Sequence, residues 1–241
     1  ERVKQIRRLN PESCVDDKKD INILRNRMFY EAEQTLLKNK DTNIAFIEAP
    51  TGAGKSNLAM NCSLKLLDKN INKIFYVYPF NTLVEQNYDT LEKIYGQTDI
   101  FKSIAVINSI TPIPLNGTRK FWENLDKEEN EKFYQKALLD RQFLNYPFIL
   151  TTHVNLFQIM FGCEREAAIS FYQLAGSVVV LDEIQSYKNV LWTEIMMFLQ
   201  CYSRLLNMKI IIMSATLPKL DMLTGNHEKV VNLIENPEKY F

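Results

Sequence analysis

The stretch IAFIEAPTGAGKS, residues 44–56, carries the strongest fold signal in this chain. Its first half is an apolar run of strand length, and its second half is a glycine-rich turn that ends in Gly-Lys-Ser. A strand that passes through such a turn into a helix is the setting of a phosphate-binding loop. The backbone N–H groups of the turn and the positive end of the following helix then bind phosphate oxygens. The stretch predicts a nucleotide site made by Thr51, Gly52, Ala53, Gly54, Lys55 and Ser56.

Each residue type in this loop has a physical reason. Gly52 and Gly54 let the backbone adopt positive φ and come close to the phosphates. Lys55 is expected to reach the β- and γ-phosphates of ATP, and the Ser56 hydroxyl to bind Mg²⁺. The general loop pattern has glycine at the first position, where this chain has Ala49.

Short apolar runs alternate with helical stretches along the rest of the chain. Several runs, such as Val178–Leu181 and Ile210–Met213, are continuous rather than alternating, which is typical of strands buried on both faces of a parallel sheet. Helices between them fit right-handed crossovers. The pattern predicts one doubly wound α/β domain with helices on both faces of a mostly parallel sheet. The expected strands are 44–49, 73–78, 104–109, 148–152, 177–182, 209–214 and a last one at 229–234.

Three helical stretches stand beside these strands. Apolar residues at helical spacing predict a helix over 21–40. Residues 119–145 are long, charged and helical in pattern, as expected of an insertion at the domain edge. Residues 190–206 place Leu191, Ile195, Phe198, Leu199, Tyr202 and Leu206 on one stripe, which we expect to pack in the core.

An acidic motif follows the apolar strand at 177–182. Asp182 and Glu183 would face the ligand crevice, because ligands of parallel sheets bind at the carboxyl ends of the strands. Asp182 is expected to hold Mg²⁺ through water, and Glu183 to orient or deprotonate the attacking water. Gln185 could contact the γ-phosphate side. The predicted catalytic residues are Lys55, Asp182, Glu183 and Gln185.

The next strand ends in Ser214-Ala215-Thr216. Two hydroxyls that lie two residues apart on a strand point the same way. Ser214 and Thr216 can therefore bond to the acidic motif and couple the phosphate state to the backbone.

The order of the phosphate loop, Asp-Glu-x-Gln and Ser-Ala-Thr resembles motifs I, II and III of superfamily 2 helicases. Ala49 at the first loop position is typical of the same superfamily. Residues 78–86, YPFNTLVEQ, are similar to motif Ia, and residues 150–153, LTTH, to the later strand-exit motif, Ic. The resemblance implies that residues 21–241 form the first RecA-like lobe of an ATP- and Mg²⁺-dependent helicase, with residues 1–20 as a linker or the end of another domain.

Residues 181–187 and the Pro-Phe-Asn-Thr form of motif Ia most resemble the CRISPR-associated helicase–nuclease of type I systems; Gln185 departs from the Asp-Glu-x-His of many members. This resemblance implies single-stranded DNA as substrate, a CRISPR RNA-guided surveillance complex as partner, and an HD nuclease domain. It also implies that Arg25, on the helix before motif I, helps to hold adenine. Residues implied to contact nucleic acid are Pro79, Phe80, Asn81, Thr82, Gln86, Thr151, Thr152 and His153.

Composition narrows the function classes. The 29 basic residues balance the 29 acidic ones, which argues against a broad basic face and favours neutral contacts to phosphates. The scattered cysteines and two histidines form no zinc or disulfide pattern, so we expect a cytoplasmic protein in a reducing compartment. No apolar run is long enough to span a membrane.

We expect the second RecA-like lobe and the HD nuclease to be absent from this segment. Without the arginine finger of the second lobe, the isolated segment should hydrolyse ATP slowly, because that group contributes on the order of 10³–10⁵ in rate. Two alternatives stay open: an RNA helicase lobe, and a docking module that uses ATP only as a conformational ligand. A small-molecule kinase is less well supported, because Ser-Ala-Thr and Thr-Thr would then be coincidences.

Overall fold

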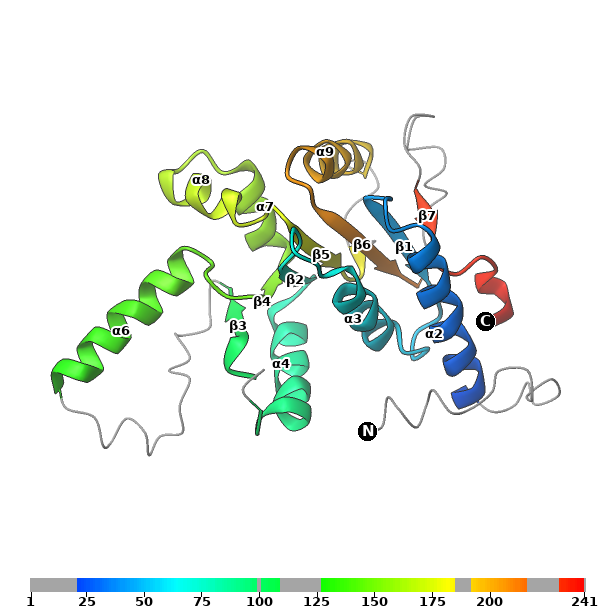
Figure 1. The fold of residues 1–241 in the computed structure, drawn as a ribbon, viewed down its shortest axis with the longest axis horizontal. Helices are drawn as coiled ribbons and strands as arrows, with labels where there is room; N and C mark the ends of the chain where they lie inside the picture. The colour runs from blue at the N-terminus through cyan, green and yellow to red at the C-terminus, as the bar shows by residue number, and fades with distance from the viewer. Residues whose placement is uncertain (1–20, 99–100, 109–126, 185–191, 216–229, 241) are drawn as a thin grey trace. The chain divides into compact units, whose positions relative to one another are not determined.

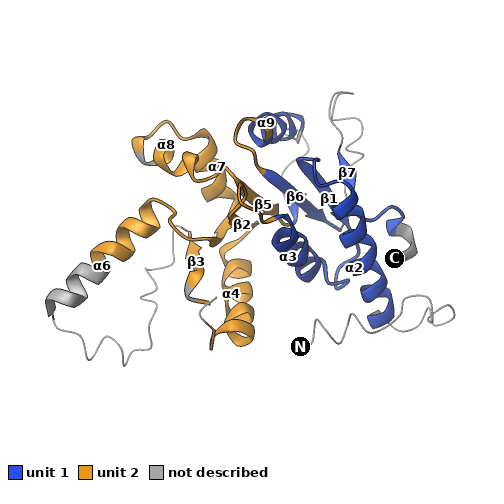
Figure 2. Ribbon diagram, in the orientation of Figure 1, with its two compact units in different colours: residues 1–66, 183–203, 209–241 blue, residues 67–182, 204–208 orange. Residues whose placement is uncertain are grey.

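The computed structural model describes residues 21–98, 101–108, 127–184, 192–215 and 230–240. The chain forms two compact units, which are coloured separately in Figure 2. Unit 1 comprises residues 1–66, 183–203 and 209–241, and unit 2 comprises residues 67–182 and 204–208.

The strands of unit 1 surround the strand that leads into the phosphate loop. This strand, β1 (Ile44–Glu48), pairs in parallel with β6 (Lys209–Ser214) on one side and with β7 (Val231–Asn232) on the other. The register runs from Ile44 opposite Ile210 to Glu48 opposite Ser214. The apolar side chains of β1 and β6 are buried, as expected of continuous apolar strands in a parallel sheet.

Helices α2 (Ile21–Lys38), α3 (Lys55–Leu66) and α9 (Trp192–Leu205) complete unit 1, with the short 3₁₀ helix η6 (Pro237–Tyr240). Figure 1 shows α3 and α9 on opposite sides of the strands of this unit. Helix α2 buries Met28, Ala32 and Leu36, which recur every fourth residue and so share one face. Its Glu33 accepts a hydrogen bond from Asn61 of α3 at 2.9 Å, which holds the two helices together.

Unit 2 has four parallel strands in the order β3-β4-β2-β5. They are β2 (Lys73–Tyr78), β3 (Ile104–Ile107), β4 (Phe148–Thr152) and β5 (Ser177–Leu181). β2 lies at the centre, with Tyr78 opposite Thr152 of β4. The carboxyl ends of β2 and β4 therefore lie side by side.

Helices cover both faces of these strands: α4 (Asn81–Tyr95) lies on one face, and α7 (His153–Phe161) with α8 (Arg165–Tyr172) on the other (Figure 1). A 3₁₀ turn, η2 (Phe101–Ser103), precedes β3. Helix α6 (Lys127–Gln142) ends beside β3, where Arg141 donates to the carbonyl oxygens of Val106 and Asn108 at 3.2 and 2.9 Å.

The predicted fold class is confirmed, since every observed strand pair is parallel and helices connect the strands. Several predicted ends were wrong by one or two residues. The first helix was predicted to end at residue 40 but ends at Lys38. The strand expected at 229–234 comprises only Val231–Asn232. Within the predicted 119–145 helix, residues 119–126 lie outside the described part.

The core stripe predicted for residues 190–206 was partly wrong. In α9 the buried apolar side chains are Met196 and Leu199, whereas Phe198 is 46% exposed. Phe198 instead stacks on Tyr202, with ring centroids 6.1 Å apart. The helix is apolar on more than one face, so periodicity alone did not define which face packs inward.

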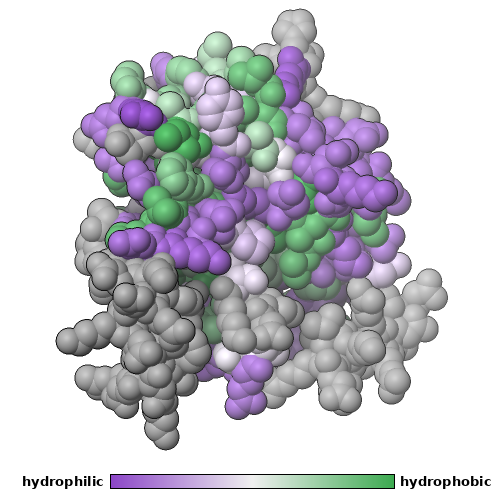
Figure 3. Space-filling model, turned by 60° about the vertical axis from the view of Figure 1, so that its left-hand side comes forward, coloured by the Kyte–Doolittle hydropathy of each residue, from purple (hydrophilic) through white to green (hydrophobic). Residues whose placement is uncertain are grey.

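The surface carries apolar side chains scattered among polar ones. In unit 2 the exposed apolar residues include Val154, Phe161, Ile169 and Tyr172. Figure 3 shows apolar areas broken up by hydrophilic residues on one face of the chain. Within the described ranges, no helix is long and apolar enough to cross a membrane.

Candidate nucleotide and nucleic-acid sites

The loop between β1 and α3 has the backbone of a phosphate-binding loop. Gly52 and Gly54 have φ of +81° and +90°, a region that L side chains rarely adopt. The N–H of Ala53 donates to the carbonyl of Pro50 at 3.2 Å, which closes a turn. A Cβ added at either glycine would meet nothing within 4 Å. Glycine is therefore required here for its φ rather than for space.

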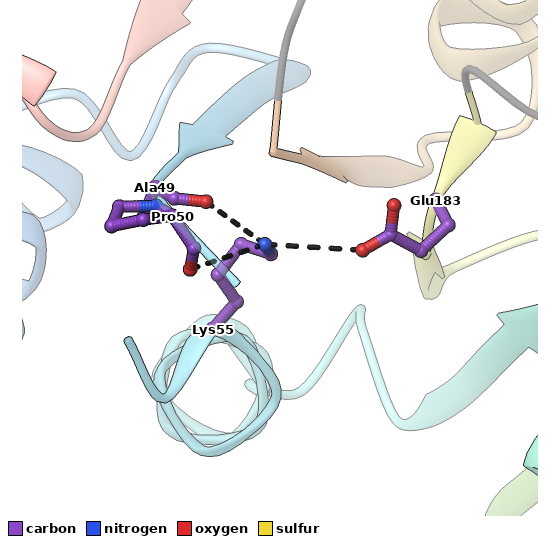
Figure 4. A network of polar contacts seen from close by, with 4 residues as sticks. All are labelled: Ala49, Pro50, Lys55 and Glu183. Carbon is purple, nitrogen blue, oxygen red and sulfur yellow. Dashed lines mark hydrogen bonds and ion pairs between the residues drawn. The ribbon is translucent and has the colours of Figure 1, made fainter. Parts of the chain in front are cut away.

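Lys55, the first residue of α3, turns its side chain back over the loop (Figure 4). Its ammonium group donates to the carbonyl of Ala49 at 2.8 Å and to that of Pro50 at 3.4 Å. The residue is only 8% exposed. Two loop carbonyls therefore hold a buried cation where the phosphates of a nucleotide are expected.

Glu183 belongs to the same unit and faces Lys55. One of its carboxylate oxygens lies 3.8 Å from the Lys55 ammonium, close enough for an ion pair (Figure 4). The Glu183 side chain is 34% exposed, so water reaches it. Its φ of +50° is unusual for a residue other than glycine, and such strained backbone is enriched at functional sites.

Asp182 precedes Glu183 in the chain and directly follows β5, which ends at Leu181 in unit 2. It is 9% exposed, and its backbone N–H donates to the carbonyl of Val77 on β2 at 2.9 Å. Burial and, to a smaller extent, the nearby Asp182 carboxylate raise the pKa of the Tyr78 phenol. Asp182 thus lies at the carboxyl end of the central strands of unit 2.

The end of β6 lies next to the start of the phosphate loop. Ser214 is fully buried and pairs with Glu48, and its carbonyl oxygen accepts from the N–H of Ala49 at 3.3 Å. This bond connects the end of β6 to Ala49, the first residue of the loop motif. Gln185 and Thr216 lie outside the described residues.

Three other residues predicted for the nucleotide site are exposed. Thr51 and Ser56 lie at the start and end of the loop. Arg25 of α2 is also exposed, and its guanidinium contacts the loop directly, donating to the Gly52 carbonyl. The sequence pattern gave no sign of this contact, nor of the Ala49 and Pro50 carbonyls as partners of Lys55.

The first set of predicted nucleic-acid residues follows β2 into α4. Phe80 is 62% exposed, and Thr82 and Gln86 are exposed as well, whereas Pro79 and Asn81 are half-buried. The first turn of α4 contains no acidic residue. Glu85, which directly precedes Gln86, is also exposed, so this part of unit 2 offers an accessible surface with one acidic side chain next to a helix N-terminus.

The second set, Thr151, Thr152 and His153, is buried at the end of β4. The Thr151 hydroxyl donates to the carbonyl of Ile107 at 2.5 Å, and the Thr152 hydroxyl caps α7 by accepting from the Asn155 N–H. Burial lowers the pKa of His153 to about 4, although backbone contacts with Asp182 and Val77 oppose the shift. These three side chains are engaged within the unit rather than displayed on its surface.

Comparisons with known proteins agree with this geometry. The DEAD/DEAH box helicase family model matches residues 30–223. The CRISPR-associated nuclease/helicase Cas3 of Haloferax volcanii is 23% identical over 188 residues, which cover 73% of this chain and 19% of that protein. This chain therefore spans about a fifth of its curated relative.

Solved structures show the same fold. The DUF1998 helicase MrfA superposes over 95% of this chain and 32% of its own, with 17% identity and a TM-score of 0.54. The T. fusca Cas3-AMPPNP structure covers 80% of this chain and 22% of its own, with 19% identity and a TM-score of 0.53. The chain belongs to the DEAD/DEAH box helicase family and has the fold of its RecA-like lobe.

Proposed function

We propose that this chain is the ATP-binding motor lobe of an ATP-dependent helicase or translocase that acts on single-stranded DNA, as part of a protein similar to the type I CRISPR helicase–nuclease. The observation that carries the proposal is the position of Lys55, held at the phosphate loop and 3.8 Å from Glu183. A cation that binds phosphate and a carboxylate that activates water are both needed for ATP hydrolysis.

The residues present fit a magnesium triphosphate. The loop Thr51–Ser56 offers backbone N–H groups, and the loop carbonyls that hold Lys55 would be replaced by phosphate oxygens as its partners. An ammonium gains more from an anionic oxygen than from a neutral carbonyl. When bound, Mg²⁺ would neutralise part of the charge on the phosphates. Ser56 and Asp182 would hold it, the carboxylate through water.

Glu183 is the proposed general base. Its side chain is open to water, and a carboxylate can accept a proton from a water molecule positioned for attack on the γ-phosphate. Its neighbour Lys55 would hold the phosphate group that is attacked. Gln185 and Ser214 with Thr216 are proposed to carry the phosphate state to the rest of the lobe.

Single-stranded DNA is the proposed substrate, bound across the carboxyl ends of β2 and β4. Phe80, Thr82 and Gln86, with Pro79 and Asn81, would contact it directly. Thr151, Thr152 and His153 would contribute through the backbone and the helix that they start. A structure of the MrfA helicase is described as bound to DNA, which supports DNA as the substrate.

Further partners follow from the same similarity. A second RecA-like lobe would supply the arginine finger, an HD nuclease would cut the translocated strand, and a CRISPR RNA-guided complex would recruit the protein. The exposed, neutral side chains of Thr82 and Gln86 support sequence-independent contacts to phosphates, which a translocating motor needs.

The proposal is tested by ATP turnover of the intact protein that carries this chain, without nucleic acid, with single-stranded DNA, and with RNA of the same sequence. We expect stimulation by DNA that exceeds stimulation by RNA. Preferential stimulation by RNA would favour an RNA helicase lobe. ATP binding without turnover under all three conditions would favour a nucleotide-dependent docking module.

A further inference from the structure

We infer that Arg25 positions the phosphate loop rather than contacting the adenine of the nucleotide. This inference rests on the proposed function, because it assigns a role in the same nucleotide site. Arg25 lies on α2, well before the loop in sequence, yet its guanidinium is bonded to the tip of the loop.

Both donors of one edge of the guanidinium converge on a single acceptor. Nε lies 3.2 Å and Nη2 lies 2.6 Å from the carbonyl oxygen of Gly52. The remaining edge is oriented by Asn22, whose Oδ1 lies 3.5 Å from Nη1. Two of its donors are bonded to the loop, so this edge of the guanidinium is committed to the Gly52 carbonyl and is not available to donate hydrogen bonds to a base.

The acceptor belongs to one of the two loop residues with positive φ. Gly52 has φ +81° and precedes Ala53, whose N–H closes the turn onto Pro50 at 3.2 Å. A carbonyl and the next N–H belong to one planar peptide and point in opposite directions. Arg25 and Pro50 therefore hold the Gly52–Ala53 peptide from its two sides, with the carbonyl turned outward and the N–H turned into the loop.

Helix α2, which carries Arg25, is anchored by its buried face and by contacts to α3. It buries Met28, Ala32 and Leu36, and Glu33 binds α3 through Asn61 and through Lys65 at 3.1 Å. The loop leads directly into α3. Arg25 thus connects α2 to the tip of the loop, and Glu33 connects α2 to α3. Loss of Arg25 would therefore release the tip of the loop and leave the contact between the two helices in place.

The two roles of Arg25 differ in what they predict for a ligand without a base. A residue that contacts adenine has no effect on inorganic tripolyphosphate, whereas a residue that positions the loop affects tripolyphosphate and ATP alike. The test uses the intact protein with Arg25→Ala, Arg25→Lys and, as a matched control, Lys38→Ala, which removes an exposed basic residue from the end of the same helix.

The measurements are KM and kcat for ATP, and the inhibition constant of magnesium tripolyphosphate as a competitor. We expect Arg25→Ala to raise KM and the inhibition constant by the same factor, roughly 10-fold, with a smaller change in kcat, because charged hydrogen bonds of this kind are strong. Arg25→Lys keeps the positive charge but loses the paired donors of the guanidinium, so it should restore only part of the affinity that Arg25→Ala loses. Lys38→Ala should match the wild type.

Three results would overturn the inference. A rise in KM with an unchanged tripolyphosphate constant would assign Arg25 to the base. An Arg25→Lys variant equal to the wild type would show that only the positive charge matters. Tighter binding in Arg25→Ala would show that the contact restrains the loop against the nucleotide. Failure of the wild type to bind either ligand would instead overturn the proposed function, and this inference with it.

Discussion

The ammonium group of Lys55 lies 3.8 Å from a carboxylate oxygen of Glu183, and both side chains belong to unit 1. The lysine starts the helix after the phosphate loop, and the glutamate belongs to the acidic motif that follows the apolar strand β5. Their proximity joins the two strongest motifs of the sequence in one place. Since Lys55 is buried and Glu183 is partly open, the pair combines a fixed cation with a carboxylate that water can reach.

Lys55→Met should lower ATP affinity by at least about 10-fold, because the variant loses a charged contact to phosphate. The measurement is equilibrium binding of ATP–Mg²⁺ by the intact protein. Lys69→Met is the control, since Lys69 is an exposed lysine just after the same helix and outside the loop. Equal affinity in wild type and Lys55→Met would remove the lysine from the site.

Gly54→Ala and Gly176→Ala should separate binding from stability. Gly54 has φ +90° and open space around it, so alanine would mainly distort the loop and weaken ATP binding. At Gly176, with φ +62°, an added Cβ would lie 2.4 Å from the carbonyl oxygen of Asn70. Gly176→Ala should therefore lower the free energy of unfolding by about 2–3 kcal/mol and leave the KM for ATP unchanged. Denaturant unfolding measures the stability of each variant, and ATP kinetics measure its KM. A raised KM in Gly176→Ala but not in Gly54→Ala would contradict the assignment of Gly54 to the ATP site.

Thr82→Val should weaken the binding of nucleic acid, whereas Thr151→Val should lower the stability of the fold. Thr82 is exposed in the first turn of α4, so its loss should weaken single-stranded DNA binding by roughly 2- to 5-fold without loss of stability. The buried Thr151 hydroxyl bonds Ile107 and accepts from Asn155 at 2.8 Å. Thr151→Val should cost about 1–2 kcal/mol of stability. DNA titrations and unfolding curves measure the two effects. Weaker DNA binding by Thr151→Val, with no change in Thr82→Val, would place the DNA strand on the Thr151 side chain.

His153 should make the fold sensitive to acid. Its pKa falls from 6.5 to about 4 on burial, so the folded chain keeps it neutral while the unfolded chain takes up a proton below pH 6.5. Its contribution to stability is therefore complete above pH 6.5 and is lost as the pH falls towards 4, by about 1.4 kcal/mol per pH unit. The stability difference between wild type and His153→Gln should fall by about 2 kcal/mol from pH 7 to pH 5. A difference that stays constant would contradict the shift.

The features that could be predicted from the sequence have local causes. Glycines at 52 and 54 and the continuous apolar runs determine backbone conformation and burial wherever they occur, so the phosphate loop and parallel strands were predictable. The acceptors of Lys55 and the contact of Arg25 with Gly52 were not, because they depend on the direction of side chains in the folded chain. The packed face of α9 was predicted only in part: Leu199 is buried as expected, but Met196 was missed and Phe198 is exposed, since a helix that is apolar on several faces has no single period.

The central claim is that Glu183 activates water for the hydrolysis of ATP bound at the loop of Lys55. The most direct test is Glu183→Gln in the intact protein, measured in parallel for ATP–Mg²⁺ binding and for turnover with single-stranded DNA. We predict that binding stays within about 2-fold of the wild type while turnover falls by 10²-fold or more, on the order expected for loss of a general base. Turnover at the wild-type rate with this variant would contradict the account.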